Sequence, residues 1–214
     1  SFPTFDIARP INIENITSLM VSSIDADRIE LTKKVEEALK HLVRQTLIQK
    51  NGDIYIFLTD EEQEINPEIE NQNVEISDII SKVSELIFDG IYEEKKYRYP
   101  SFNGRYAFGF NQIVDDRPYK NNQNFDINLK ILTPNWDMSI DETTLRMMSG
   151  QEKSIIVALP EDSAFIDEIR FALKIEKYLR SNAVNVITKY DQIKEAKRVE
   201  MRDRNANARL FLEE

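Results

Sequence analysis

The sequence has no cysteine, one histidine and only five glycines among its 214 residues. The absence of cysteine excludes disulfides, thiolate chemistry and cysteine-based zinc sites, and it is compatible with a reducing cytosol. The single imidazole, His41, excludes imidazole-rich metal sites and most hydrolytic triads. No apolar run reaches the roughly 20 residues of a membrane span, so we expect no membrane partner.

Nucleotide-binding motifs are also missing, because the pattern G-x-x-x-x-G-K-[ST] occurs nowhere. Residues 154–169 have the strand-loop-helix form that nucleotide sites often use, but their loop contains no glycine that lets the backbone approach a phosphate. The pair Asp115 and Asp116 has the chemistry of a metal ligand or an acid/base couple, but the Arg-Pro that follows favours a turn. We therefore expect no catalytic, cofactor-binding or metal-binding residues in this chain.

Acidic residues outnumber basic ones by ten, and the charge is unevenly distributed. Residues 60–94 contain twelve acidic side chains and one basic side chain, which gives a net charge of −11. Residues 95–120 have the opposite character, with a net charge of +4. This distribution argues against a protein that nucleic acid coats everywhere, and it confines such contacts to local basic patches.

The N-terminal part has the pattern of a winged-helix-like unit. Apolar residues repeat at helical spacing over 27–48, and Asp25 or Asp27 is placed to cap this helix. Two short apolar runs then flank Asn51 and Gly52, a pair that supplies the positive φ angles of a hairpin turn. A helix followed by a hairpin, with shorter helical material upstream, is the element order of a winged helix.

An acidic helical connector follows the hairpin. Thr59 and Glu62 fit the S/T-x-x-E capping box at its start. We expect Pro67 to end or kink this helix, and a second helix to run from Ser77 to about Ile91. The acidity of this segment is then largely that of solvated helix faces and helix caps.

The sequence becomes aromatic and β-rich after the connector, with Asn103-Gly104 as a further hairpin turn. The run 126–132 predicts a strand, and the almost wholly apolar run 154–159 predicts a strand at the centre of a sheet. Between them, residues 133–153 are expected to form a loop with a short helical turn.

The C-terminal part is predicted to be a helix over 163–180, a short strand at 185–187 and a charged helix capped by Thr188. Because the chain starts without Met and is still helical in character at Glu214, we expect a piece of a longer protein. The expected fold class is α+β or mixed α/β, in four parts: a winged-helix-like unit at 1–59, an acidic helical connector at 60–94, a mixed α/β unit at 95–187 and the start of a long charged helix at 188–214.

Two groups of cations are candidate nucleic-acid contacts. The first lies on the helix before the first hairpin and at the hairpin turn, and it consists of Lys33, Lys34, Lys40, Arg44 and Lys50. Such positions contact phosphates in helix-turn-helix proteins. Glu36 and Glu37 lie among them, however, and the next segment repels DNA. We therefore favour a solvated face or a protein-docking surface over DNA contact at this helix.

The second group lies in the most basic and aromatic stretch of the chain. Its cations are Lys95, Lys96, Arg98 and Arg105, and its aromatic residues are Tyr97, Tyr99, Phe102, Tyr106, Phe108 and Phe110. Rings interleaved with cations suit stacking on bases or holding a nucleic-acid backbone. A twisted hairpin with its aromatics packed inward and its cations in water gives the same pattern, and we favour that structure.

Three stretches together resemble one known family. They are VEEALKHLVRQTLIQKNGDIYIFLTDEEQEIN at 35–66, NGRYAFGFNQIVDDRPY at 103–119 and KIEKYLRSN at 174–182. They are similar to the large P-loop ATPase component of bacterial BREX phage-exclusion systems, the BrxC/PglY family, and the similarity extends over most of the chain. FLTDEEQEI followed by GRYAFGFN is the most specific combination.

The resemblance implies a much longer cytoplasmic protein, a homo-oligomer, that acts with a partner methyltransferase and other BREX components to modify host DNA and block phage replication. It also implies that ATP and Mg²⁺ bind the parent protein through Walker motifs upstream of this chain. We therefore expect a non-catalytic internal part that contacts duplex DNA or other subunits. The alternative is a purely structural oligomerisation module with no nucleic-acid role.

Overall fold

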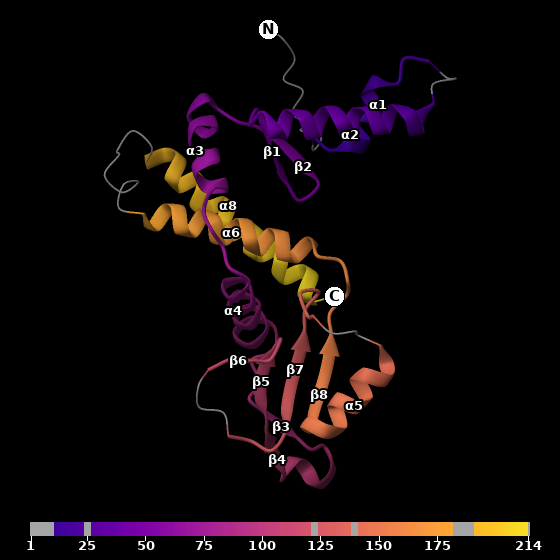
Figure 1. Cartoon of the computed structure of the whole chain (residues 1–214), viewed down its shortest axis with the longest axis vertical. Helices are drawn as coiled ribbons and strands as arrows, with labels where there is room; N and C mark the ends of the chain where they lie inside the picture. Colours follow the sequence, from indigo (N-terminus) through magenta and orange to yellow (C-terminus); the bar gives the residue numbers. More distant parts are fainter. Residues whose placement is uncertain (1–10, 24–26, 121–123, 138–140, 182–190, 214) are drawn as a thin grey trace. The chain divides into compact units, whose positions relative to one another are not determined.

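The computed structural model describes residues 11–23, 27–120, 124–137, 141–181 and 191–213. The chain is mixed α and β, which confirms the expected class, and it divides into two compact units (Figure 1). Unit 1 comprises the chain up to Gln72 with Lys177–Lys197, and unit 2 comprises Asn73–Glu176 with Arg198–Glu214. The four-part division of the sequence stays a prediction, and its acidic connector contributes one helix to each unit.

Unit 1 begins with two helices, a hairpin and a third helix. These elements are α1 (Ile13–Met20), α2 (Arg28–Arg44), β1 (Ile48–Asn51), β2 (Ile54–Phe57) and α3 (Asp60–Glu70). The side-chain oxygen Oδ1 of Asp27 caps α2 by accepting hydrogen bonds from the backbone N–H groups of Ile29 and Glu30, at 2.9 and 3.1 Å. The other predicted cap, Asp25, lies outside the described residues. A winged-helix classification of this unit stays a prediction.

The hairpin turn lies one residue later than predicted. β1 and β2 pair antiparallel with Asn51 opposite Ile54, so Asn51 belongs to the strand and the two-residue turn is Gly52–Asp53. Only Gly52 has a positive φ in this turn, at 57°, and glycine adopts that angle without steric cost. Val35 and Leu39 of α2 are buried with Ile48 and Tyr55 of the hairpin, and these four residues form the core of unit 1.

The acidic segment forms two helices, as predicted. The capping box at the start of α3 is present, because Thr59 Oγ1 accepts from the Glu62 N–H at 3.3 Å and Glu62 Oε2 accepts from the Thr59 N–H at 2.9 Å. Pro67 does not end this helix at once, since α3 continues to Glu70. In unit 2 the second helix is α4 (Ile76–Leu86), followed by one turn of π-helix, η1 (Ile87–Ile91).

Unit 2 is built on a four-stranded sheet and a separate two-stranded ribbon. In the sheet, of order β6-β5-β7-β8, the strands β5, β7 and β8 are parallel and β6 is antiparallel to β5. The ribbon pairs β3 with β4 antiparallel. The strands are β3 (Lys96–Arg98), β4 (Ala107–Gly109), β5 (Asn111–Val114), β6 (Arg117–Pro118), β7 (Asn128–Leu132) and β8 (Ser154–Ala158). The remaining helices are η2 (Ser101–Gly104), α5 (Glu142–Glu152), α6 (Ala164–Arg180) and α8 (Asp191–Glu213).

The core of unit 2 lies between one face of the sheet and the helical elements α4, η1, α6 and α8. Val114 of β5 and Ile131 of β7 are paired in the sheet and point to the same face. The buried apolar side chains that join them in one cluster come from α4, η1, α6 and α8: Ile79, Ile80, Val83, Ile87, Phe88, Phe165, Ile166, Ile169 and Ala208. The helical spacing seen in the sequence of α4 therefore corresponds to its buried face.

Two predictions about the sheet region were wrong. Among the described strands, β8 lies at the edge of the four-stranded sheet rather than at its centre, and its apolar residues Ile155 and Val157 are 61% and 43% exposed. Residues 133–153 contain the eleven-residue helix α5 rather than a short turn, and Met148 is the only residue of α5 that is buried. The strand predicted at 185–187 and the cap predicted at Thr188 lie outside the described residues.

The opposite face of the sheet contains a buried cation, Lys130. Its side chain is 2% exposed, donates a hydrogen bond to Glu152 Oε2 at 3.0 Å and forms an ion pair with Asp116. The ammonium group lies 4.9 Å from the ring centroid of Trp136. Burial disfavours the charged form, but the two carboxylates outweigh that effect and raise the pKa of Lys130. These contacts tie the β5–β6 turn and the end of α5 to β7.

An exposed cluster joins η1 to the end of β6. Tyr119 donates a hydrogen bond from its hydroxyl to Asp89, and Lys120 pairs with Asp89 Oδ1 at 2.8 Å. The Tyr119 ring also stacks on Phe88, with ring centroids 5.7 Å apart. The hydrogen bonds from Lys120 and then from Tyr119 lower the pKa of Asp89.

We predict that removing the partners of Lys130 destabilises the chain more than removing Lys130 itself. Asp116→Asn with Glu152→Gln leaves a buried ammonium without a counter-charge, at an expected cost of about 3 kcal/mol or more. Lys130→Met leaves an apolar side chain of similar volume beneath Trp136. It also frees the carboxylates of Asp116 and Glu152, which are partly exposed, to be hydrated, so we expect a cost below about 1.5 kcal/mol. Urea unfolding of both variants tests this order. The reverse order would mean that the ion pairs contribute net stability.

We also predict that Lys120→Met raises the pKa of Asp89 toward its ordinary value, because the largest cause of the lowering is then lost. At pH values above the ordinary pKa of an aspartate, the ionised Asp89 stabilises the fold. This contribution disappears as the pH falls through the lowered pKa. The variant should therefore lose that part of the pH dependence of unfolding. NMR titration of the Asp89 carboxyl carbon measures the shift, with Lys82→Met, whose lysine pairs with Glu85, as control. An unchanged Asp89 midpoint would contradict the assignment.

Candidate contact surfaces

The first predicted group of cations lies on α2 and β1, with Lys40 and Arg44 on the outer face of α2 and Lys34 at the end of the groove described below. All five side chains, Lys33, Lys34, Lys40, Arg44 and Lys50, are exposed. Lys34 pairs with Glu30 at 2.6 Å, and this hydrogen bond raises the pKa of Lys34. Lys40 and Arg44 border a shallow pocket of about 390 Å³ together with Glu37 and His41. Acidic side chains are therefore interspersed with the cations, as the sequence indicated.

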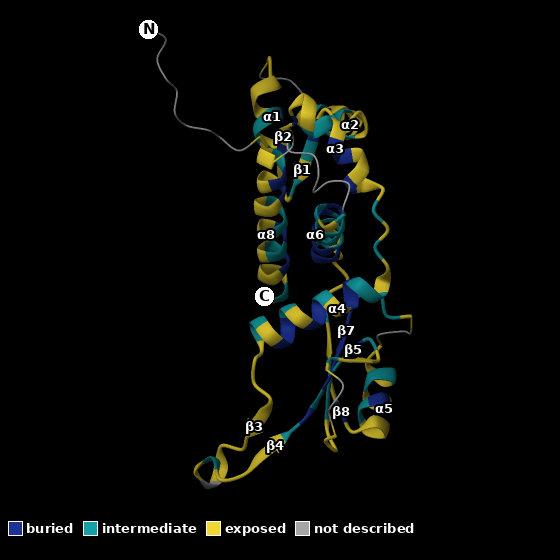
Figure 2. Cartoon of the chain, turned by 90° about the vertical axis from the view of Figure 1, so that its left-hand side faces the viewer, coloured by how far each residue is buried: buried dark blue, intermediate teal, exposed yellow. Residues whose placement is uncertain are grey.

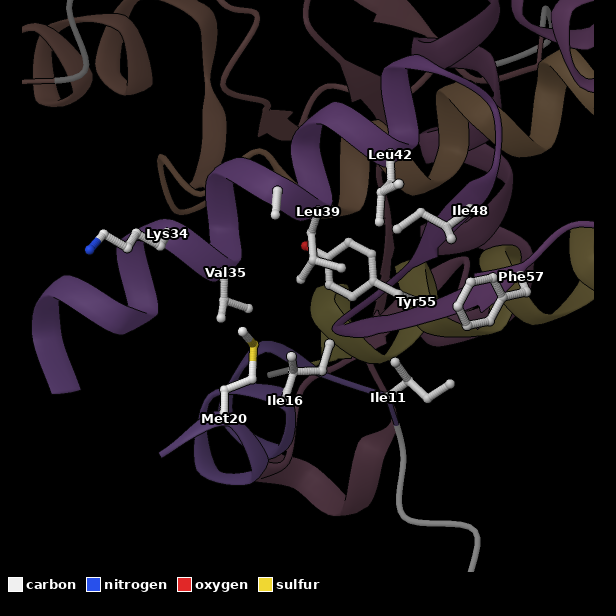
Figure 3. A pocket seen from close by; sticks show the side chains of 11 residues that line it. Ile11, Ile16, Met20, Lys34, Val35, Leu39, Leu42, Ile48, Tyr55 and Phe57 are labelled. Atoms are coloured by element: carbon white, nitrogen blue, oxygen red, sulfur yellow. The ribbon is translucent and has the colours of Figure 1, made fainter. Parts of the chain in front are cut away.

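An apolar groove lies on the other side of α2. It has a volume of about 290 Å³ and is lined by side chains of α1, α2 and the β1–β2 hairpin (Figure 3). Tyr55 and Leu39 lie at its centre, and Lys34 lies at one end with its ammonium group directed away from the apolar side chains (Figure 3). Two lining residues, Met20 and Phe57, are 56% and 72% exposed. The groove therefore combines an apolar hollow with apolar side chains that project beside it.

The second predicted group lies on the β3–β4 ribbon, which extends beyond the sheet of unit 2 and is exposed except at Gly109, where it joins the sheet (Figure 2). The turn at its tip contains Asn103 and Gly104, both with positive φ, which confirms the predicted hairpin. Lys95, Lys96, Arg98 and Arg105 are all exposed. So are the aromatic side chains Tyr97, Tyr99, Tyr106 and Phe108. The side chain of Phe102 lies outside the described part of the structure.

The favoured packing of the ribbon aromatics was therefore wrong. We expected the rings to pack inward and only the cations to face water, but of the five described rings only Phe110 is buried. Phe110 lies where β4 continues into β5, and its ring is 5.9 Å from that of Tyr92. Further along the ribbon, the strands extend past the sheet (Figure 2), and the core cluster of unit 2 includes none of their described aromatic side chains.

Asn111 anchors the ribbon where it joins the sheet. Its side-chain amide donates to the Phe125 carbonyl at 2.7 Å and accepts from the Phe125 N–H at 3.0 Å, which imitates the pairing of a neighbouring strand. The Phe125 ring in turn covers Gly109, where a Cβ atom would lie 2.2 Å from the ring. Glycine at this position of β4 therefore lets the Phe125 ring pack against the base of the ribbon.

The pair Asp115 and Asp116 has a structural role. Both residues have positive φ in the turn between β5 and β6, which is the turn the sequence predicted. Asp115 Oδ1 accepts from the Thr133 N–H at 2.8 Å, and Asp116 pairs with Lys130. Their carboxylates thus bind different partners instead of facing a common ligand. Among the described residues there is no cluster of three or more side chains suited to hold a metal ion.

Sequence reasoning identified the cations but missed the groove and the anchor of the ribbon. The groove forms where three elements meet, and the pattern of each element shows only that it has an apolar face. The role of Asn111 depends on a contact fourteen residues along the chain, for which the sequence contains no local signal. Within the described ranges, each helix is too short or too polar to cross a lipid bilayer.

Residues 72–214 match the family described as BREX ATP-binding protein BrxC 4th domain with six-stranded beta sheet. The matched region contains six described strands, β3 to β8, divided here between the ribbon and the four-stranded sheet. No solved structure matches the chain significantly. Because the match covers about two thirds of the sequence, the chain belongs to the BrxC family of BREX ATP-binding proteins and contains its fourth domain.

Proposed function

We propose that this chain is a non-catalytic contact region of a BREX defence ATPase, and that its exposed cations bind nucleic acid. ATP and Mg²⁺ bind elsewhere in the parent protein, which works in the cytoplasm with other BREX components such as the methyltransferase. Unit 1 acts as a winged-helix-like element in this proposal. The region contributes binding rather than chemistry, which agrees with the absence of a P-loop sequence and with the separate structural partners of Asp115 and Asp116.

The observation that carries the proposal is the exposure of the cations on the ribbon. Lys95, Lys96, Arg98 and Arg105 all face water, and they belong to residues 95–120, which have a net charge of +4. Most of the affinity of proteins for nucleic acid comes from such contacts with phosphates, which release condensed counterions. The cations of α2 are secondary, because Glu30 and Glu37 lie beside them and reduce the local potential.

Charge reversal on the ribbon tests the nucleic-acid proposal. We expect the 214-residue chain to bind fluorescently labelled DNA at 50 mM salt, with an affinity that falls as salt rises. Lys96→Glu with Arg98→Glu should weaken binding to all sequences about equally and make the logarithmic salt slope shallower by about 1 to 2. Fluorescence anisotropy measures both quantities. Lys40→Glu with Arg44→Glu measures the contribution of α2 in the same assay.

The matched control reverses two exposed cations in the α5 region of unit 2. Arg146 pairs with Glu142 on α5, and Lys153 is the residue that ends this helix. Arg146→Glu with Lys153→Glu changes the net charge as much as the ribbon variant does, so it accounts for the general electrostatic effect. If the wild-type chain does not bind DNA at 50 mM salt, or if the control variant loses as much affinity as the ribbon variant, the nucleic-acid proposal fails.

A second candidate function is self-association through the apolar groove of unit 1. A symmetric dimer buries the same patch on both copies, so the patch must contain both hollows and projections. The groove meets this condition, because the exposed side chains of Met20 and Phe57 project beside its hollow. In this proposal the occupant is a second copy of the chain, and the groove helps to order the ATPase into an oligomer.

Sedimentation velocity tests the second candidate. We expect the wild-type chain to show concentration-dependent dimers, and Met20→Ser with Phe57→Ser to weaken their formation at least tenfold. Ile155→Ser with Val157→Ser, which removes exposed apolar side chains from β8, is the matched control and should leave the dimer intact. A chain that stays monomeric at high concentration, or a dimer that both double variants weaken equally, would eliminate the groove as the dimer contact.

A further inference from the structure

The aromatic side chains of the β3–β4 ribbon lie on one face. Tyr97 is directly opposite Phe108 in the antiparallel register, and the Tyr99 N–H donates to the Tyr106 carbonyl at 2.9 Å. Because side chains alternate along a strand and opposite residues share a face, these two pairs point to the same side of the ribbon. The four rings are between 43% and 52% exposed. The ribbon therefore presents a continuous aromatic surface to solvent.

The other face of the ribbon has a different composition. Lys96 lies opposite Gly109 and Arg98 lies opposite Ala107, so each long cation is paired with a small residue. Lys95 comes immediately before β3 at the base of the ribbon, and Arg105 immediately before Tyr106 near its tip. Lys96 and Arg98 therefore lie on the face opposite the rings, and the positive charge nearest the aromatic face lies at the two ends of the ribbon, at Lys95 and Arg105.

Exposed aromatic rings require an explanation, because water is a poor solvent for them. A purely apolar partner would satisfy the rings but would offer no counter-charge to Lys95 and Arg105 at the ends of the aromatic face. An unpaired nucleotide satisfies both groups at once, since its base stacks on a ring and its phosphate pairs with a cation. Duplex DNA does not fit the rings equally well, because its bases are already stacked and paired inside the helix.

We infer that the aromatic face of the β3–β4 ribbon binds single-stranded nucleic acid, with bases stacked on Tyr97, Tyr99, Tyr106 and Phe108. Lys95 and Arg105 at the ends of the ribbon pair with phosphates, and Lys96 and Arg98 on the other face add to the local positive potential. This inference rests on the proposed nucleic-acid contact and names its substrate. Consecutive rings on one strand are separated by two residues, about 6.8 Å, so the ribbon accommodates roughly two to four nucleotides. Base recognition by stacking tolerates any sequence, because every base has a π face.

The test uses the full 214-residue chain with a fluorescent twelve-nucleotide oligo(dT) and a twelve-base-pair duplex. We expect tighter binding to the single strand. Tyr97→Leu and Phe108→Leu keep an apolar side chain but remove the ring, and each should weaken single-strand binding about tenfold. Tyr97→Phe keeps the ring and should bind like the wild type. Phe211→Leu removes an exposed ring from α8 and should have no effect. Equal urea midpoints for all variants establish that they are folded.

Photo-crosslinking gives a second readout that does not depend on variants. Oligo(dT) in which 5-iodouracil replaces thymine should crosslink to peptides that contain residues 97–108, identified by mass spectrometry. Crosslinks confined to other parts of the chain would overturn the inference even if the chain bound the oligonucleotide.

The outcomes separate the inference from the proposed function. If Lys96→Glu with Arg98→Glu weakens DNA binding but the leucine variants do not, the phosphate contact stands and the stacking inference is overturned. Duplex binding as tight as single-strand binding overturns the inference in the same way. If neither nucleic acid binds at 50 mM salt, the proposed function and the inference fail together.

Discussion

The apolar contact between the parallel sheet and helices α4 and α6 is the interaction on which the rest of unit 2 depends. Parallel strands are stable when apolar surfaces cover them, and Val114 and Ile131 are buried completely or almost completely beneath these helices. Each such side chain contributes about 2 kcal/mol when it is removed from water. This core fixes β5 and β7 side by side and so defines the end of the sheet from which the ribbon extends.

The ribbon combines a fixed base with an uncovered tip. Phe110 is buried where β4 meets β5, and Asn111 binds both backbone groups of Phe125, so the first residues of the ribbon are held by the sheet. Beyond Phe110, no described part of the core covers the rings, although burying them would stabilise the fold. The base of the ribbon is thus held by the sheet while four of its rings are exposed, and this arrangement supports the proposal that the ribbon is a binding element.

The sequence predicted those elements whose signals are local. The capping box of Thr59 and Glu62, the apolar stripe of α4 and the hairpin turn at Asn103-Gly104 all depend on residues a few positions apart, and all are present. The predictions that failed concern which other helices or strands an element packs against. The apolar residues of β8 did not reveal that it is an edge strand, because composition reports a tendency to be buried and not the position in a sheet.

The candidate site illustrates the same limit. The alternation of rings and cations in the sequence placed the rings on one face of a hairpin, but it did not determine whether another element covers that face. The exposed fractions of Tyr97 and Phe108 supply this information. Likewise, α5 was missed because Met148 is its only buried residue, so its sequence has no strong amphipathic pattern.

Aromatic ¹³C–¹H NMR of the full chain during titration with oligo(dT) tests the central claim most directly. If bases stack on the ribbon, ring currents should shift the signals of Tyr97, Tyr99, Tyr106 and Phe108, while the exposed ring of Phe211 keeps its position. Unchanged signals from the four ribbon rings at a concentration where anisotropy shows binding would contradict the account.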